Sequence, residues 1–336
     1  DIVTGGDCSL GAQKSWLYGE MVDNYYFYRR IPSVNPAAYG DMASYFDALL
    51  NPDLDGSGRY IDRWSYVQDT ASYSQFFDAG QTMDYGLRLA GRAEDPVPVR
   101  VRHVVPGSPA ALAGLARGMV IDRINGVDAA VLKAAGDFSV LSPSTTGVLM
   151  TLQVRDGVGA STAREVPLRS AVYDLAPVTN TQVLSSPGGA KVGYLNFTEF
   201  VDAALTPLDN AFRAFRSQGV TQLVLDLRYN GGGSVDVARR LASGIAGSWA
   251  QNQTFTLLSF NDKRQAENIR FRFDAALGPQ ALNLAKVYVL TGPRSCSASE
   301  MVINGLKPFV DVVQIGGTTC GKPFGFQPVD HCGLTY

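Results

Sequence analysis

Histidine and cysteine are both scarce in this chain of 336 residues, which contains two histidines and four cysteines. The cysteines show neither a Cys-x-x-Cys pair nor a Cys/His spacing suited to zinc, so the sequence predicts no metal site and no cofactor. The formal net charge is −2, which gives nucleic acid or an anionic membrane no electrostatic reason to bind. No apolar run reaches the length of a transmembrane helix.

The composition is that of a globular protein, with 46% hydrophobic and 18% charged residues. A chain of this length has room for two or three domains. It begins at Asp1 without the pattern of a signal peptide, so we expect any targeting segment to have been removed or to lie outside this sequence.

Residues 1–80 predict a helical region rich in aromatic residues. An apolar stripe runs along one broad helical face, and its members are Trp16, Leu17, Met21, Val22, Tyr25 and Tyr28. Pro32 and Pro36 end this helix, and a second helix is predicted over 39–50. Residues 51–58 resemble the start of a calcium loop, but position twelve is Trp64 instead of the required glutamate, so we expect a turn.

A strand–turn–helix pattern surrounds Ser297. Residues 286–290 form a short apolar run, small residues follow, and an apolar helical spacing begins at Glu300. A hydroxyl at such a turn lies at a helix N-terminus, where backbone N–H groups and the dipole favour negative charge. Ser297 is therefore placed like a nucleophile, although serines at 295, 297 and 299 are, taken alone, more often only helix caps.

Lys322 is the predicted base for this serine. His103 lies in an alternating run typical of an exposed strand face, His331 lies in a loop, and neither has an acidic partner nearby in sequence. Lys322 follows a strand-like run over 310–315, and no carboxylate lies among the five residues before it. As a base, a lysine needs its pKa lowered from ~10.4 to about 7, which corresponds to ~4 kcal/mol of desolvation and neighbour effects.

Residues 171–336 predict an α/β domain. Strands are expected at 192–197 and 222–227, with an amphipathic helix at 207–215 between them. The second strand leads into a glycine-rich turn, 228–234, and then into a helix. The turn has neither the Gly-Lys-Ser/Thr ending of a phosphate-binding loop nor the Gly-x-Gly-x-x-Gly spacing of a dinucleotide site.

Together these segments resemble the carboxyl-terminal processing (tail-specific) serine peptidases. The likeness covers roughly residues 80–327, and it rests on Ser297-Ala298-Ser299-Glu300, on Lys322, and on Asp-Leu-Arg with Asn-Gly-Gly-Gly at 226–233. The resemblance implies a multidomain α+β protein: an N-terminal helical region (1–80), a PDZ-like β-barrel (81–170) and an α/β peptidase core of the ClpP/crotonase type (171–336). The family's domain normally continues past this chain's end, so we expect the C-terminal part of the core to be missing.

The resemblance also assigns roles at the site. The members are the nucleophile Ser297, the base Lys322, and the oxyanion donors Gly231 or Gly232 with Ala298. Glu300 belongs to the same polar network and helps to hold Lys322, although an exposed acid favoured by the helix dipole is the plainer interpretation. Gln327 would orient the base, but it follows Lys322 by five residues where four is usual.

Residues 81–170 resemble a PDZ domain, with strands expected at 99–105 and from Met119, and a short helix and turn at 106–115. Tyr85, Gly86 and Leu87 would form the loop and strand that receive a peptide's terminal carboxylate. Such a domain adds an extended chain end to a sheet edge as a further strand. The expected partners are therefore proteins or peptides with free C-termini, whereas a small barrel used as a spacer is the simpler interpretation.

Two other functions stay open. The first is a peptide-binding adaptor with a degenerate catalytic core, which the shifted spacing of Gln327 favours. The second is a cysteine hydrolase that uses Cys296 with His331, for which the sequence offers a thiol and an imidazole but no oxyanion site.

The four cysteines allow three disulfide pairings. Cys320 and Cys332 flank a short loop and form our preferred pair, while Cys296 is as readily a buried free thiol. A disulfide implies an oxidising compartment. Together with the resemblance, this predicts an extracytoplasmic protein, periplasmic or attached to the cell envelope, with a lipoprotein precursor as one form.

Overall fold

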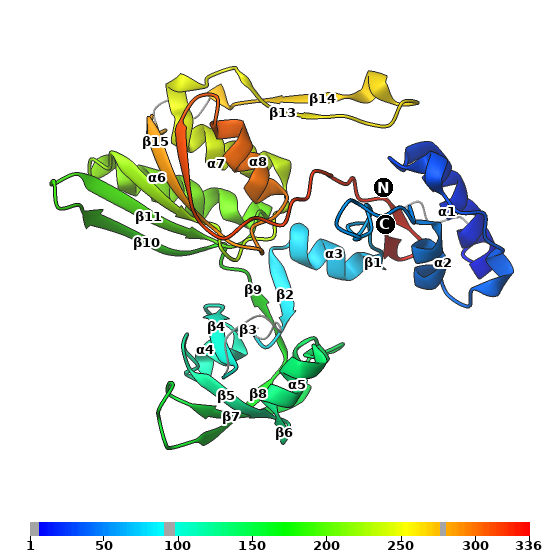
Figure 1. Cartoon of the computed structure of the whole chain (residues 1–336), viewed down its shortest axis with the longest axis horizontal. Coiled ribbons are helices and arrows are strands. Elements are labelled where there is room, and N and C mark those ends of the chain that lie inside the picture. Colours follow the sequence, from blue (N-terminus) through cyan, green and yellow to red (C-terminus); the bar gives the residue numbers. More distant parts are fainter. Residues whose placement is uncertain (1–6, 91–97, 276–279) are drawn as a thin grey trace. The chain divides into compact units, whose positions relative to one another are not determined.

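The structure is a computed structural model that describes residues 7–90, 98–275 and 280–336 (Figure 1). The chain forms two compact units, one made of residues 75–179 and the other combining 1–74 with 180–336. The N-terminal helical region therefore clusters with the C-terminal α/β region. The expected middle boundaries, 81 and 170, lie six and nine residues inside those of the compact unit, 75 and 179.

A five-stranded sheet forms the centre of the larger unit. Its strands, in spatial order, are β10 (Val178–Ser185), β11 (Lys191–Phe197), β12 (Gln222–Asp226), β15 (Lys286–Thr291) and β16 (Asp311–Gly316). From β11 to β16 each neighbouring pair is parallel. The connections carry the helices α6 (Leu205–Ser217), α7 (Val235–Ala246) and α8 (Ala298–Leu306), which Figure 1 shows beside the sheet. The predicted strand–helix alternation of the core is confirmed.

Alternate residues of the central strands are buried. Leu223 and Leu225 of β12 are in register with Val287 and Val289 of β15, and all four have no exposed surface. Their neighbours, such as Val224, are only half-buried. Because side chains alternate between the two faces of a strand, one face of the sheet is covered more completely than the other.

The N-terminal region packs as two helices with a small sheet. α1 (Leu10–Asn24) and α2 (Met42–Leu49) share a buried cluster made of Leu17, Met21, Met42, Tyr45, Phe46 and Leu49. The last two strands of the chain, β17 (Asp330–His331) and β18 (Leu334–Thr335), form a hairpin, and β18 pairs with β1 (Gln68–Asp69), which leads into α3 (Thr70–Phe77). The short 3₁₀ turns η1 (Tyr28–Arg30) and η2 (Pro36–Ala38) lie between the first two helices.

α1 ends at Asn24, earlier than the apolar stripe predicts. The hairpin of β13 (Thr254–Leu258) and β14 (Ile269–Arg272) explains this end. From its tip the side-chain amide of Asn261 donates to the carbonyls of Asp23, at 2.9 Å, and Tyr25, at 3.2 Å. These bonds satisfy the orphan carbonyls of the last turn, which nothing in the local sequence could show.

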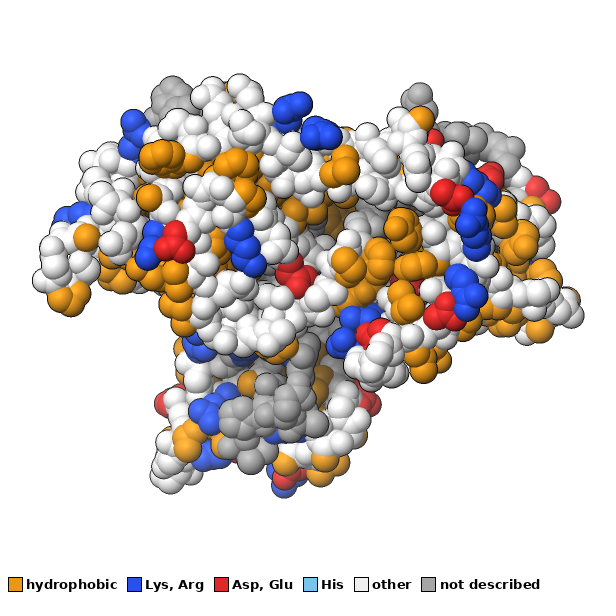
Figure 2. All heavy atoms as spheres, turned by 45° about the horizontal axis from the view of Figure 1, so that its top comes forward, with side chains coloured by type: hydrophobic (Ala, Val, Ile, Leu, Met, Phe, Trp, Pro, Cys, Tyr) orange, Lys and Arg blue, Asp and Glu red, His pale blue; other side chains and the backbone are white. Residues whose placement is uncertain are grey.

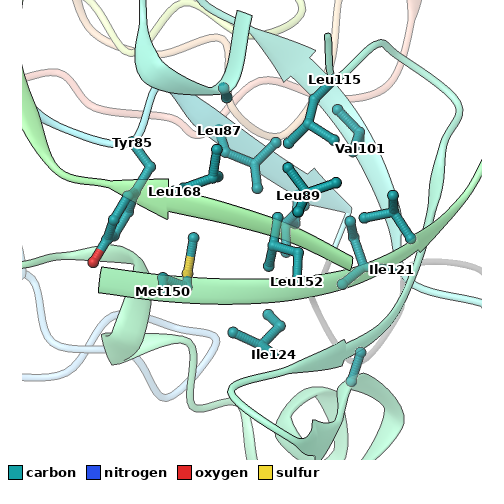
Figure 3. Close-up of a cluster of buried hydrophobic side chains, with 14 of the residues drawn as sticks. Tyr85, Leu87, Leu89, Val101, Leu115, Ile121, Ile124, Met150, Leu152 and Leu168 are labelled. Carbon is teal, nitrogen blue, oxygen red and sulfur yellow. The ribbon is translucent and has the colours of Figure 1, made fainter. Parts of the chain in front are cut away.

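The smaller unit is built on antiparallel strands. Its main sheet has the order β3 (Leu87–Ala90), β4 (Arg100–Val104), β5 (Val120–Ile124), β7 (Leu149–Arg155) and β8 (Arg164–Arg169), with β6 (Val127–Asp128) paired to β5. A second pair joins β2 (Gln81–Asp84) to β9 (Ala171–Asp174), and the helices are α4 (Pro109–Leu112) and α5 (Ala129–Ala135). Figure 3 shows the apolar core that the main sheet encloses, including Tyr85, Leu87 and Met150.

Two expected turns can be checked directly. Asn125 and Gly126 both have positive φ, 50° and 81°, and join β5 to β6 as a two-residue hairpin loop. In the segment expected to be a turn and not a calcium loop, Asp53 pairs with Arg30 and Asp55 accepts hydrogen bonds from Ser57 and Arg59. The acids of that segment are therefore engaged by the protein itself.

Charge is dispersed on the surface. On the face in Figure 2, basic and acidic side chains lie among one another without a continuous basic patch. Among the helices of the described residues, none combines the length and the apolar character that a bilayer span requires.

Candidate active site

Ser297 lies at the start of α8 in an unusual backbone conformation. β15 ends at Thr291, and six residues later Ser297 has φ 54° and ψ −114° as the N-cap of the helix. A positive φ is strained for a residue with a side chain, and such strain is concentrated at functional sites. The predicted strand, turn and helix around this serine are confirmed.

The glycine-rich turn after β12 lies directly against this serine. A Cβ atom on Gly232 would be 2.8 Å from the Cβ of Ser297 and 2.9 Å from the carbonyl oxygen of Cys296. Gly232 also has φ 106°. Only glycine allows this approach of the two backbones, so the third position of Asn-Gly-Gly is fixed by contact with the segment that carries Ser297.

Asn230 joins the two turns, and the sequence reasoning missed it. Its carbonyl accepts the N–H of Cys296 at 3.1 Å and the hydroxyl of Ser299 at 3.0 Å. Its fully buried side chain accepts the N–H of Gly232 at 2.8 Å and donates to the carbonyl of Phe197 at 3.1 Å. The available signal was an asparagine directly before three glycines, where a side-chain amide can bind the backbone of its own turn.

The expected oxyanion donors have different environments. The N–H of Gly232 is used by the side chain of Asn230. The N–H groups of Gly231 and Ala298 donate to no atom of the described residues, as expected for an exposed turn and the first residue of a helix. Of the predicted donors, Gly231 and Ala298 are therefore the two that could serve an incoming carbonyl.

Upstream of the turn, Asp226 is buried in an ion pair. It accepts hydrogen bonds from the guanidinium of Arg228, at 2.6 and 2.9 Å, and from the hydroxyl of Tyr194 at 2.7 Å. Burial acts to raise the pKa of Asp226, but these donors outweigh it and hold the pKa below its usual value. The Asp-Leu-Arg segment thus anchors the C-terminal end of β12.

Glu300 is the centre of the hydrogen-bond network at the site. Its Oε2 accepts the N–H of Ser297 at 2.9 Å and the N–H of Lys322 at 3.0 Å. Its Oε1 accepts the hydroxyl of Thr319 at 2.6 Å and the N–H of Gly321 at 2.8 Å. One carboxylate in the first turn of α8 therefore binds the backbone on both sides of the site, which is more than a favourable contact with the helix dipole.

The Lys322 side chain lies against aromatic rings. Its Nζ is 5.6 Å from the ring centroid of Trp64 and 5.1 Å from that of Phe326. Burial lowers the pKa of Lys322, while the charge of Asp62 acts to raise it. Within the described residues no hydrogen bond joins Nζ to the hydroxyl of Ser297, so the structure brings the two backbones together but does not pair the two side chains.

Gln327 forms no hydrogen bond with this network among the described residues. The side chain is exposed and forms no hydrogen bond with a described residue. The segment from Gly317 to Val329 has no helix or strand, and Phe326 turns its ring toward Lys322. Within the described residues no hydrogen bond joins Gln327 to Lys322, and its orienting role stays a prediction.

The disulfide prediction was wrong. Cys296 is bonded to Cys320, and Cys8 is bonded to Cys332. The N–H of Cys320 donates to the carbonyl of Ser295 at 3.0 Å, which brings Cys320 beside Cys296. Cys332 lies in the turn between β17 and β18, and that hairpin pairs with β1 of the N-terminal region.

These bonds also contradict the cysteine-hydrolase alternative. Cys296 has no thiol, and the ring of His331 stacks on Trp16 with centroids 3.9 Å apart. Within the described residues, Cys296, Glu300 and Cys320 form the one group whose ligand atoms cluster closely enough for a metal ion, all within 4.8 Å. Both sulfurs are bonded to each other, so they offer no thiolate ligand.

In the smaller unit, the expected carboxylate-binding loop is sharply constrained. Gly86 has φ 73°, and a Cβ there would be 2.0 Å from the Cβ of Ser108. The carbonyl of Gly86 accepts the N–H of Val105 at 2.9 Å, while the side chains of Tyr85 and Leu87 are buried in the core. β3, which begins at Leu87, is a terminal strand of its sheet within the described residues.

Comparison with known proteins decides the family. A sequence model of peptidase family S41 matches residues 191–330, and a model of the S41 N-terminal domain matches residues 12–66. The crystal structure of a Bacteroides fragilis protein assigned to the S41 proteases is 30% identical, with a TM-score of 0.70 over 95% of this chain and 82% of that one. The chain belongs to peptidase family S41.

Two curated relatives are 27% and 28% identical to this chain over the aligned residues. The chloroplastic carboxyl-terminal-processing peptidase 3 of Arabidopsis thaliana is 27% identical over 66% of this chain and 42% of the relative. The carboxyl-terminal-processing protease of Picosynechococcus sp. is 28% identical over 73% of this chain and 55% of the relative. This S41 chain thus spans about half the length of the curated relatives it matches.

A second solved structure shares the fold of the S41 chain. The photosystem II D1 C-terminal processing protease is 20% identical, with a TM-score of 0.54 over 96% of this chain and 85% of that one. The expected multidomain architecture with an α/β core is therefore confirmed.

Proposed function

We propose that this S41 chain is a serine endopeptidase of the carboxyl-terminal processing type, which cleaves protein chains near their C-termini through Ser297 and Lys322. The observation that carries the proposal is the position of Glu300. Its Oε2 accepts the N–H of Ser297 at 2.9 Å and the N–H of Lys322 at 3.0 Å. The backbones of the nucleophile and the base are thus held by a single carboxylate.

The proposed reaction begins with a neutral Lys322. Because burial lowers the pKa of this amine, a larger fraction of it is unprotonated at a given pH. With its backbone fixed by Glu300, the lysine side chain can rotate about its own bonds and carry Nζ from the aromatic rings to the hydroxyl of Ser297. Lys322 then takes the hydroxyl proton as Oγ attacks the peptide carbonyl.

The negative charge that forms on the carbonyl oxygen needs donors. The N–H groups of Gly231 and Ala298 are the predicted donors that the described residues leave unused. As the tetrahedral intermediate collapses, the C–N bond breaks and Lys322 returns its proton to the leaving amine, which leaves an acyl-enzyme on Ser297 and a neutral Lys322. Water then hydrolyses the ester with Lys322 again as base.

For substrate selection, we propose that the PDZ-like region captures the free C-terminus of an unfolded chain. Three features support this: the curated relatives are named for carboxyl-terminal processing, β3 is a terminal strand among the described residues, and Gly86 forms a constrained loop before it. An extended tail would pair with β3, and its carboxylate would bind backbone N–H groups near Gly86 and Leu87.

We also propose an extracytoplasmic location. Two disulfides link Cys8 to Cys332 and Cys296 to Cys320, and such bonds persist in oxidising compartments. Periplasmic or envelope-attached proteins meet this condition.

The adaptor with a degenerate core remains the second candidate, because Gln327 is exposed and forms no hydrogen bond with Lys322 within the described residues. Labelling by a fluorophosphonate probe separates the two. A peptidase forms a covalent adduct on Ser297, which mass spectrometry of the tryptic peptides locates, and Ser297→Ala abolishes it. An adaptor gives no adduct while still binding peptides with free C-termini.

A further inference from the structure

The Cys296–Cys320 disulfide connects the two sides of the proposed active site. Cys296 immediately precedes Ser297, and Cys320 lies two residues before Lys322. Between them the chain passes through α8 and β16, so the bond closes this whole segment into a covalent loop. The other disulfide, Cys8–Cys332, joins the two ends of the chain and involves neither predicted catalytic residue.

The segment that carries Lys322 has few other anchors. After β16, the N–H of Gly317 donates to the carbonyl of Thr291 at 3.0 Å, and the carbonyl of Gly317 accepts from the hydroxyl of Thr291 at 2.9 Å. Cys320 then donates to Ser295, and Glu300 accepts from Thr319, Gly321 and Lys322. Beyond Lys322, the next backbone hydrogen bond within the described residues is that of Val329. Lys322 is therefore the last residue with a backbone hydrogen bond before Val329, and between them the rings of Phe324 and Phe326 are held by aromatic contacts.

Reduction would act directly on the carboxylate that holds both catalytic backbones. The Sγ of Cys320 lies 3.4 Å from the Oε2 of Glu300, the same oxygen that accepts from Ser297 and Lys322. In the disulfide this sulfur has no proton to donate. A free thiol at the same place gains an S–H donor, which competes with the two backbone N–H groups for Oε2.

We propose that the Cys296–Cys320 disulfide is a positioning element of the peptidase, and that its reduction by a dithiol slows hydrolysis by releasing the Lys322 segment from Glu300. This inference rests on the proposed function of Ser297 and Lys322. The reductant supplies two electrons and two protons. Its first sulfur attacks one cysteine to give a mixed disulfide, and its second sulfur displaces that cysteine, leaving two protein thiols and an oxidised dithiol.

The expected effect is on turnover more than on binding. Displacement of a catalytic group by ~1 Å can cost ~100-fold in rate, because the chemistry needs a near-attack geometry. The peptide-capture region is a separate compact unit without cysteine. We therefore expect kcat to fall at least tenfold on reduction while KM changes by less than about threefold, and kcat to return on reoxidation.

The experiment compares two variants, each oxidised and then reduced with dithiothreitol, with free thiols counted by titration. Cys8→Ala/Cys332→Ala contains only the active-site disulfide and should lose and regain kcat as that bond is broken and reformed. Cys296→Ala/Cys320→Ala should have a low kcat that does not respond to the reductant. Full kcat in the first variant after complete reduction would overturn the proposal.

A second readout does not depend on catalysis. Backbone hydrogen exchange at Gly321 and Lys322 should become at least tenfold faster when Cys8→Ala/Cys332→Ala is reduced, while exchange in β12 stays unchanged. If exchange at these two residues is the same in both redox states, the disulfide does not position the segment. If exchange accelerates but neither redox state hydrolyses peptides, the positioning stands and the proposed peptidase function fails.

Discussion

Gly232 lies so close to Ser297 that a Cβ on the glycine would be 2.8 Å from the Cβ of the serine. Real Cβ atoms do not approach so closely, and the flanking carbonyl of Cys296 and N–H of Ala298 are within 3.0 Å of the same point. The two turns of the site therefore fit together only if one of them has no side chain at this position.

Gly232→Ala should consequently reduce kcat by about 100-fold or more, because the added methyl group displaces Ser297 from its position. The positive φ of 106° adds strain for alanine. Gly19→Ala, at an exposed position of α1, is the control, since a Cβ there meets no atom within 4 Å, and it should retain activity within about threefold. Steady-state hydrolysis of an unstructured peptide measures both, and equal loss in the two variants would argue against a specific contact.

Glu300→Gln should be nearly as damaging, despite its similar shape. The carboxylate accepts two hydrogen bonds on each oxygen, whereas an amide has one accepting oxygen. Whichever way the amide turns, two donors lose their acceptor, so we expect a loss of ~2–4 kcal/mol in stability and at least 100-fold in kcat/KM. Glu165→Gln, at an exposed position of β8, is the control, and both values should stay near those of the wild type. Thermal unfolding and peptide hydrolysis of the same samples test this.

The contrast between Ser297 and its surroundings shows what sequence could predict. The position of Ser297 could be predicted because a buried strand, small residues and an apolar helical spacing follow one another along the chain. Asn230 was missed because its role depends on Cys296 and Ser299, which are more than sixty residues away. The disulfides were mispaired for the same reason, since the contact between Ser295 and Cys320 that fixes one of them is a tertiary hydrogen bond.

The packing of the N-terminal helices illustrates the same limit. Its helices were predicted from apolar spacing, but their clustering with the α/β region comes from the β13–β14 hairpin and from β17 and β18, which no local pattern connects to residues 1–80. Local periodicity predicts elements, whereas the partners of each element depend on side chains distant in sequence.

The pH dependence of the reaction should report the environment of Lys322. A neutral lysine is required as base, and burial lowers its pKa, so kcat/KM should rise with pH through a pKa below 10.5. Trp64→Ala admits water near Nζ and should move this rise to higher pH. Asp62→Asn removes the charge that favours the protonated amine and should move the rise to lower pH. Shifts of the same sign in both variants would point to another group as the base.

His103 should make the smaller unit sensitive to acid. Burial, with Arg88, Arg102 and Arg117 nearby, lowers its pKa from 6.5 to about 4. Between pH 4 and pH 6.5, His103 is protonated in the unfolded state but neutral in the folded state. The free energy of unfolding therefore decreases as the pH falls from 6.5 toward 4. Allowing for solvent screening, we expect a loss of ~1–2 kcal/mol. Hydrogen exchange in β3 and β4 at two pH values measures it, and His103→Gln should reduce the pH dependence.

The last prediction concerns capture of the substrate tail. A terminal carboxylate bound by backbone N–H groups near Gly86 forms charge-assisted hydrogen bonds worth ~1.5–3 kcal/mol each. Replacing it by an amide should therefore raise KM at least tenfold, which needs only ~1.4 kcal/mol. The measurement is cleavage of one peptide with a free or an amidated end. Gly86→Ala, whose Cβ would clash with Ser108 at 2.0 Å, should remove the preference, whereas Gly157→Ala, in open space in the same unit, should keep it. If the wild-type chain cleaves both ends equally well, this region does not recognise tails, and a spacer role for residues 81–170 becomes the better explanation of its fold.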